Sequence, residues 1–186
     1  MDEAGARGAV GLYETDPRAV MPIEGFRVPA SVRRGLRRRA YAIRVDAAFG
    51  EVVAACAEHR EGVWLTPRLG EAYRGLHLLG LAHSVEAWAG GRLAGGLFGV
   101  ALGGLFTSES MFHRTPDAGN AALVGTAALL AARGFVLWDI QMSSPHTARF
   151  GAVDLARGEY LARLEAALAL ERSLAHPPGR APGLRP

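Results

Sequence analysis

The chain has 186 residues and a formal net charge of +3, and because every basic residue is an arginine its isoelectric point is near 9.6. This length supports one well-filled core. Nearly half of the residues are apolar, yet no run of about eighteen uninterrupted apolar residues occurs, so neither wholesale disorder nor a membrane span is indicated. With Cys56 as the only cysteine and no secretory pattern in residues 1–10, we expect a cytoplasmic protein without an internal disulfide or a membrane partner.

The pattern of residues in the N-terminal third predicts short helices and a short strand. An irregular segment is expected over 13–29, followed by a helix over 31–39, a strand over 41–45 and a second helix over 46–58 with one apolar stripe. Both helices open on a residue suited to N-capping, Ser31 and Asp46.

A third helix and a set of strands follow. Thr66 and Pro67 are typical of a cap and a first helical position, and Gly80 is typical of a helix end. The apolar face of this helix comprises Leu69, Tyr73, Leu76 and Leu79. Alternating hydrophobicity then predicts an antiparallel meander: strands over 83–89 and 93–101 joined by a Gly90-Gly91 turn, and another strand through Phe106.

The C-terminal third combines helices with a buried strand. Asp117 precedes a long apolar helix that ends at Arg133, and 135–142 reads as a fully buried strand. A short helix after Pro145, a strand near Val153 and an amphipathic helix over about 157–175 complete the series. Helices interleaved with strands around one mixed, largely antiparallel sheet predict an α/β or α+β fold.

Five glycines interrupt the predicted meander: Gly95, Gly96, Gly99, Gly103 and Gly104. Glycine inside a strand marks a bulge or a close approach of a ligand or another backbone. The sequence alone leaves two explanations open, a ligand at this surface or a helix packed tightly on the sheet.

Five arginines crowd into the first predicted helix: Arg33, Arg34, Arg37, Arg38 and Arg39. Such a cluster attracts phosphates through Coulomb attraction and counterion release. The alternative is a solvated helix face.

The signatures of the common hydrolases and kinases are missing, since there is no Gly-x-Ser-x-Gly, no phosphate loop ending in Gly-Lys-Ser/Thr and no His-Glu-x-x-His. Six histidines are scattered without metal-ligand spacing. We therefore expect neither a metal nor a cofactor.

Two polar groups in apolar surroundings are candidates for a site. Glu109 lies between serines in an otherwise apolar run, where an ionised carboxylate needs a donor or a cation. Asp139 and Gln141 are two residues apart in the predicted strand, so their side chains share one face, opposite Trp138. A structural hydrogen bond to a neighbouring loop is the alternative to a binding or catalytic role.

A series of motifs resembles the bacterial leucyl/phenylalanyl-tRNA-protein transferases over roughly 13–168. It begins with Asp16-Pro17-Arg18-Ala19-Val20 and continues in register through Trp64-Leu65-Thr66-Pro67, Glu71-Ala72-Tyr73, His83-Ser84-Val85-Glu86-Ala87-Trp88, Gly95-Gly96-Leu97-Phe98-Gly99-Val100, Glu109-Ser110-Met111-Phe112, Asp139-x-Gln141 and Pro145-His146-Thr147-Ala148.

The resemblance implies a fold similar to the acyl-CoA N-acyltransferases, with a truncated N-terminal subdomain. The expected organisation is a disordered N-terminus over 1–12, a small RNA-binding part over 13–62, a catalytic domain over 63–175 and a flexible tail over 176–186. The implied donors are leucyl-tRNA and phenylalanyl-tRNA, with methionine a further candidate. The implied acceptors are proteins with N-terminal Arg or Lys, which the added residue marks for the N-degron pathway. We expect a monomer.

The resemblance also implies residue roles. Asp139 would hold Gln141, whose amide oxygen would meet the incoming amine. The aminoacyl pocket would comprise Leu97, Phe106, Glu109, Met111, Leu123 and Trp138. Trp64 and Tyr13 would stack on the terminal adenosine, and the five clustered arginines would cover the acceptor stem.

The sequence departs from the family pattern at Thr107-Ser108, where the family has Cys-Gly, and at Gly119-Asn120, where it has Ser-Lys. Two alternatives therefore stay open. One is a CoA-dependent N-acetyltransferase, whose pyrophosphate loop has a near match over Arg92 to Leu97. The other is an aminoacyl-tRNA-binding homologue with lost or altered transfer activity.

Overall fold

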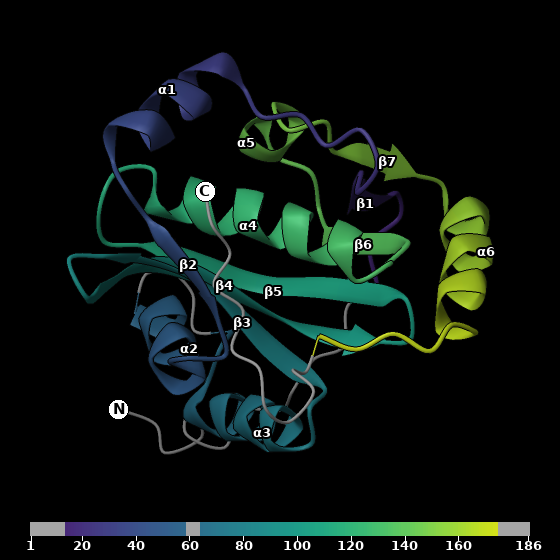
Figure 1. The fold of residues 1–186 in the computed structure, drawn as a ribbon. Coiled ribbons are helices and arrows are strands. Elements are labelled where there is room, and N and C mark those ends of the chain that lie inside the picture. Colours follow the sequence, from purple (N-terminus) through teal and green to yellow (C-terminus); the bar gives the residue numbers. More distant parts are fainter. Residues whose placement is uncertain (1–13, 59–63, 175–186) are drawn as a thin grey trace, which may run out of the picture.

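The computed structural model describes residues 14–58 and 64–174, so Tyr13 and the predicted end segments 1–12 and 176–186 lie outside the described residues (Figure 1). Within this range the chain forms β1 (Arg18–Met21), α1 (Ala30–Arg38), β2 (Ala42–Val45), α2 (Phe49–Glu58), α3 (Pro67–Leu78), β3 (Ala82–Ala89), β4 (Arg92–Leu102), β5 (Leu105–His113), α4 (Ala118–Ala132), β6 (Leu137–Gln141), α5 (Pro145–Ala148), β7 (Val153–Leu155) and α6 (Arg157–Leu168).

One seven-stranded sheet organises the fold, in the order β2-β3-β4-β5-β6-β1-β7. All neighbours pair antiparallel except β5 and β6, which are parallel. Helix α4 packs across β3, β4 and β5, and α2 and α3 cover the same strands from the other side (Figure 1). The predicted mixed, largely antiparallel sheet flanked by helices is confirmed.

The parallel pair β5/β6 opens after three residue pairs. Pairing runs from Leu105↔Leu137 to Thr107↔Asp139, whereas β5 continues to His113 with only β4 beside it. β4 and β5 also shift register between Phe98 and Gly99. From Ser108 onward, therefore, one edge of β5 is not covered by a strand, and β6 ends at Gln141 beside this opening. Divergent strands of this kind leave backbone groups and side chains available to a ligand.

Close packing explains the glycines of the meander. A Cβ on Gly95 would lie 2.8 Å from the Cβ of Ala118 at the start of α4, and one on Gly103 would lie 2.7 Å from the carbonyl oxygen of Ala167 in α6. A Cβ on Gly99 would collide with its neighbours Phe106 and Thr107. Of the two explanations left open by the sequence, neighbouring helices and strands account for these bare positions.

Both predicted N-caps in the N-terminal third are wrong. Helix α1 begins after Pro29, and the Ser31 hydroxyl instead accepts a hydrogen bond of 2.8 Å from Arg149. Helix α2 begins at Phe49, and the Asp46 carboxylate accepts from the backbone N–H of Ser84 and contacts His83. Both side chains therefore form tertiary hydrogen bonds instead of capping a helix. The predicted cap at Thr66 is confirmed by its bond from Leu69 N–H.

Several element bounds also differ from those predicted. The segment expected to be irregular contains β1, four residues long, which pairs with β6 and β7 far along the chain. The strand expected over 135–142 covers only Leu137–Gln141. It is also not fully buried at its flanks, where Val136 is 57% and Met142 66% exposed. Leu79 is 73% exposed rather than buried, because α3 ends at Leu78. Helix α6 ends at Leu168, earlier than expected.

The N-terminal and C-terminal parts of the chain share this sheet. β1 and β2 come from the proposed N-terminal part but occupy an inner position and one edge of the sheet. Met21 and Val32 pack in the same buried cluster as Trp138 and Leu130. The boundary predicted between residues 62 and 63 falls within 59–63, outside the described residues, and the separate RNA-binding role of 13–62 stays a prediction.

Candidate functional site

Asp139 is a buried carboxylate whose oxygens are occupied by donors. Its side chain is 1% exposed and forms a salt bridge with Arg18, with Nη2–Oδ2 at 2.8 Å and Nε–Oδ2 at 3.0 Å. The Tyr160 hydroxyl donates to the same oxygen at 2.7 Å. Oδ1 accepts from the backbone N–H of Gln141 at 2.7 Å. A carboxylate bound in this way is well placed to hold structure, since few lone pairs are left to accept a substrate proton.

The pKa directions agree with this arrangement. Burial lowers the pKa of Arg18, but its hydrogen bond and Coulomb attraction to Asp139 outweigh burial, and the net pKa is raised. Burial raises the pKa of Tyr160, and the hydrogen bond to Asp139 raises it further. Arg18 therefore stays a cation and Tyr160 stays a neutral donor around Asp139 at every physiological pH.

Gln141 has a backbone that side chains hold in an uncommon conformation. It ends β6 with φ = 66°, in the left-handed region that non-glycine residues seldom adopt. Asp139 accepts from its N–H, and the Thr15 hydroxyl donates to its carbonyl oxygen at 3.1 Å. Strained residues persist where the surroundings over-determine them, and they cluster at functional sites.

The Gln141 amide has a fixed direction. Its Nε2 lies 3.4 Å from the Ser108 carbonyl oxygen and 3.4 Å from Glu109 Oε2. Both partners are acceptors, so the NH₂ group must face them and Oε1 must face away. Among the described residues none donates to Oε1. Gln141 thus presents one available acceptor beside the opening between β5 and β6.

Glu109 joins the Gln141 amide to α3. Its Oε2 accepts from the Tyr73 hydroxyl at 2.9 Å as well as from Gln141. Burial raises the pKa of Glu109, partly offset by the hydrogen bonds from Tyr73 and Gln141. Burial also raises the pKa of Tyr73, and the neighbouring Glu109 charge adds to the shift. A half-buried carboxyl with a raised pKa at an opening in a sheet is typical of a functional site.

The structure therefore connects the two polar groups found in the sequence. Asp139 and Gln141 meet through a backbone N–H, and Gln141 and Glu109 meet through their side chains. Asp139 contacts Gln141 through the backbone N–H, which the left-handed turn brings to the carboxylate, and the expectation that Asp139 holds Gln141 for catalysis stays a prediction. Trp138 donates from Nε1 to the Ser108 hydroxyl at 2.8 Å, beside the same opening.

The residues expected to line an aminoacyl pocket separate into two groups. Five of them pack in one apolar cluster: Leu97, Phe106, Met111, Leu123 and Trp138. Of these five, only Met111 is partly exposed. Phe26 stacks on Trp138 in this cluster at a ring distance of 5.8 Å. Glu109 instead points to Tyr73 and Gln141. Their role as a pocket stays a prediction.

The residues expected to contact RNA make no hydrogen bond to this network within the described part of the chain. The five clustered arginines are all exposed, four of them on α1 and Arg39 just after it. Trp64 packs at the edge of the cluster formed by α2 and α3, and its buried Nε1 has no hydrogen-bond partner among the described residues.

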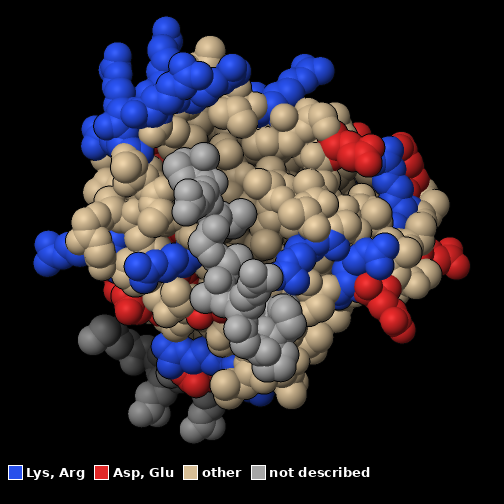
Figure 2. Space-filling view, in the orientation of Figure 1, with Lys and Arg blue, Asp and Glu red and all other residues tan. Residues whose placement is uncertain are grey.

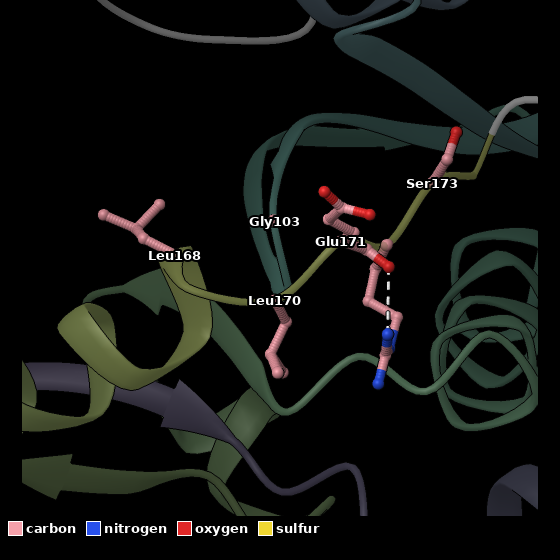
Figure 3. Close-up of a pocket in the computed structure, with 6 residues that line it drawn as sticks. Gly103, Leu168, Leu170, Glu171 and Ser173 are labelled. Carbon is pink, nitrogen blue, oxygen red and sulfur yellow. Dashed lines mark hydrogen bonds between the residues drawn. The ribbon is translucent and has the colours of Figure 1, made fainter.

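A separate hollow lies at the other end of β5. It is lined by Gly103, next to the β4–β5 turn, and by residues of the segment after α6, including Leu170 and Glu171 (Figure 3). Arg172 donates to the backbone oxygen of Glu171. No side chain of the Gln141 network is among the lining residues.

Comparison with known proteins then decides the family. A family profile described as "Leucyl/phenylalanyl-tRNA protein transferase" matches residues 20–165. The chain belongs to this family. A leucyl/phenylalanyl-tRNA–protein transferase of Rubrobacter xylanophilus is 50% identical over 173 residues, 92% of this chain and 90% of the relative. Those of Nitratidesulfovibrio vulgaris and Herpetosiphon aurantiacus are 47% and 46% identical, covering 82% and 87% of this chain and 67% and 84% of the relatives.

Solved structures of other proteins have a similar fold. One is a GCN5-related glucosamine N-acetyltransferase region of a fungal multi-domain β-N-acetylglucosaminidase, with a TM-score of 0.55 at 11% identity over 76% of this chain and 20% of that chain. Another is L-PGS from Bacillus licheniformis, with a TM-score of 0.54 at 10% identity over 84% of this chain and 66% of that chain. The expected likeness to the acetyltransferase fold is confirmed.

Three residues of this hydrogen-bond network were not identified from the sequence. Arg18 was visible only as part of the Asp-Pro-Arg motif, Tyr73 appeared to be a packing residue, and Tyr160 carried no signal at all. The segment from Arg92 to Leu97, which nearly matches a pyrophosphate loop, lies within β4 and not in a loop that begins a helix. This removes the sequence feature that favoured a CoA-dependent acetyltransferase.

Proposed function

We propose that this protein transfers leucine or phenylalanine from aminoacyl-tRNA to the N-terminal Arg or Lys of acceptor proteins. Methionine is a further candidate donor residue. The observation that carries the proposal is the Gln141 amide, which is fixed by acceptors on its nitrogen and offers its oxygen beside the opening between β5 and β6. In a chain of this family, that is where an acceptor amine and an aminoacyl ester would meet.

The chemistry asks for placement more than for activation, because the ester is already reactive. The acceptor amine nitrogen forms a bond to the ester carbonyl carbon, the bond from that carbon to the ribose oxygen breaks, and the amine's proton ends on the released ribose hydroxyl. Gln141 Oε1 accepts one N–H of the amine and aims its lone pair at the carbonyl. Orientation of this kind is worth several kcal/mol of the barrier.

Asp139 acts on Gln141 and not on the substrate. Its oxygens are engaged by Arg18, Tyr160 and the Gln141 N–H, so it fixes the left-handed backbone from which the amide projects. Glu109 and the Ser108 carbonyl oxygen fix the other end of the side chain. Both ends of Gln141 are therefore held before substrate arrives, which preorganises the site.

The donor would lie along β5 and the adjoining apolar cluster. Met111 is a partly buried member of that cluster, and its sulfur would lie 3.3 Å from a Cβ on Gly119 at the start of α4. A greasy surface at this place favours leucyl and phenylalanyl side chains by size and apolarity. The α1 arginines would contact the acceptor-stem phosphates, and Trp64, together with Tyr13, would stack on the terminal base.

The cellular setting completes the proposal. In the described part of the chain, no helix is long and apolar enough to span a membrane. We propose action in the cytoplasm as a monomer, where the added residue would direct acceptors into the N-degron pathway.

The test is a transfer assay with three separately charged donors, leucyl-, phenylalanyl- and methionyl-tRNA. Acceptor peptides begin with Arg, Lys or Ala and are otherwise identical. The proposal expects product with Arg and Lys peptides, none with the Ala peptide, and a preference for leucyl or phenylalanyl donors. Absence of product with every donor overturns it, and tRNA binding without turnover would support the binding-homologue alternative. Saturable binding of acetyl-CoA in a calorimeter would revive the acetyltransferase alternative.

A further inference from the structure

A second set of arginines lies at the end of the sheet where the site opens. β5 and β6 are parallel and both end there, as do the C-terminal end of β3 and the first residues of β4. Arg92 begins β4 and Arg114 directly follows β5, while Arg44 lies on β2, the edge strand. All three are exposed. Basic side chains thus gather at this end of the sheet, outside α1.

A groove connects two of these arginines. It is lined by Trp88 and the β3–β4 turn on one side and by Arg114 and Thr115 on the other, with Arg92 between them and Glu51 of α2 as its acidic member. Arg44 lies outside the groove lining, but its guanidinium sits 4.7 Å from the Trp88 ring centre. Two cations and one carboxylate line the groove, and Arg44 adds a third cation beside it, so this surface carries a net positive charge.

Contacts hold two of the three guanidinium groups in place without neutralising them. Arg44 rests on Trp88, and Arg114 rests on the Phe112 ring at 5.3 Å and donates to the Leu93 carbonyl oxygen. Cation–π contact fixes the planar group and leaves its N–H donors for another acceptor. Such cations lose less entropy when they bind a phosphate.

The three arginines of this surface differ from four arginines elsewhere that are ion-paired. Arg18, Arg74, Arg157 and Arg163 each have a carboxylate within hydrogen-bond distance. In residues 14–58 and 64–174, by contrast, no such ion pair is found for Arg44, Arg92 or Arg114. Unpaired cations on one end of a molecule make an anion-binding surface.

This surface continues into α1. The Tyr41 hydroxyl, between α1 and β2, bonds to the Thr115 hydroxyl at 2.9 Å and donates to the Pro116 carbonyl oxygen at 2.7 Å. Gly35 of α1 faces the Asp117 carboxylate at this junction. In Figure 2, blue atoms gather over α1 and recur at the side where Figure 1 places β2 and the β3–β4 turn.

We propose that Arg44, Arg92 and Arg114 form a second phosphate-binding surface for the RNA backbone of the donor, continuous with α1. The proposal rests on the proposed function, because it takes tRNA as the polyanion. The chemistry it requires is phosphate contact by guanidinium groups, without base reading.

The test compares two double variants of equal charge change. Arg44→Gln with Arg92→Gln removes two cations of the surface and leaves Arg114 in its contacts. Arg163→Gln with Arg172→Gln removes two cations from α6 and the segment after it. The Kd for uncharged tRNA is measured at several salt concentrations, and transfer is measured with both phenylalanyl-tRNA and phenylalanyl-adenosine, a donor that lacks the RNA backbone.

We expect the surface variant to raise the tRNA Kd by about three- to tenfold at low salt and to reduce the slope of log K against log salt by about 1 to 2. Its turnover of phenylalanyl-adenosine should equal that of wild type, and the control should match wild type in every measurement. An unchanged Kd and slope, or an equal loss in the control, overturns the second surface. If wild type turns over neither donor, the proposed function fails instead.

Discussion

Tyr160→Phe removes a single oxygen from the group that holds Asp139. The Tyr160 hydroxyl donates to Asp139 Oδ2 at 2.7 Å, and the ring lies 5.4 Å from the Arg18 guanidinium, so phenylalanine keeps the ring contact and loses only the hydrogen bond. A hydrogen bond to a charged group is worth about 1.5 to 3 kcal/mol. Because Tyr160 is partly exposed, the lower end applies.

Two magnitudes follow. A loss of about 1.5 kcal/mol lowers the melting temperature by roughly 3 to 6 °C for a chain of this size. If the whole of this loss appears as a higher activation free energy, because Gln141 is held less firmly in the transition state, the rate falls about tenfold. We therefore expect kcat to fall by up to about tenfold while the KM for both substrates stays unchanged, since Asp139 does not touch substrate.

The assay is steady-state transfer of phenylalanine to an Arg-initiated peptide, run at least 15 °C below the melting temperature of the variant (a margin of roughly three times the expected shift). Tyr41→Phe is the matched control, because its hydroxyl is likewise hydrogen-bonded but lies outside the Asp139 network. It should leave kcat at the wild-type value. A Tyr160→Phe protein that is less stable yet keeps the full kcat would refute the coupling between Asp139 and Gln141.

Three further predictions test other parts of the structure. Glu109→Gln should raise the melting temperature relative to wild type, and by more as the pH rises from 4 to 7. Partial burial raises the pKa of Glu109, so wild type loses stability as this carboxyl ionises, whereas glutamine does not ionise. The kcat should fall, and a melting-temperature difference that stays constant across pH would contradict this prediction. His146→Gln should reduce the loss of stability below pH 6.5, since burial, Arg149 and His113 lower the pKa of His146 and its stabilising neutral form is lost as the pH falls; melting curves from pH 7 to pH 4 check this. Gly95→Val should cost about 1 to 3 kcal/mol in urea unfolding because its Cβ would meet Ala118, whereas Gly75→Ala, with open space around it, should not destabilise.

The sequence located the polar residues of the site but not their connections. Asp139 and Gln141 could be found because acid and amide side chains are conspicuous in an apolar strand. Their shared link through the Gln141 backbone could not, since strict alternation assumes extended residues and Gln141 is left-handed. The partners Arg18 and Thr15 lie more than a hundred positions away along the chain. Such contacts depend on the sheet order, which placed β1 beside β6.

The fold was predicted in class but not in detail, for a similar reason. Periodicity identified every long helix and the β3–β4–β5 meander, because these repeat over many residues. β1 was missed because it is four residues long and gains its pairing only from β6 and β7. The capping predictions at Ser31 and Asp46 failed where distant partners, Arg149 and Ser84, competed for the same oxygens.

Replacement of Gln141 by methionine tests the account most directly. Methionine keeps the length and the Cβ of glutamine at the left-handed position but offers no amide oxygen to the amine. Single-turnover transfer from phenylalanyl-tRNA to an Arg-initiated peptide should slow by roughly 100-fold, with donor binding and melting temperature close to wild type. Transfer by Gln141→Met at the wild-type rate would contradict the central role assigned to the Gln141 oxygen.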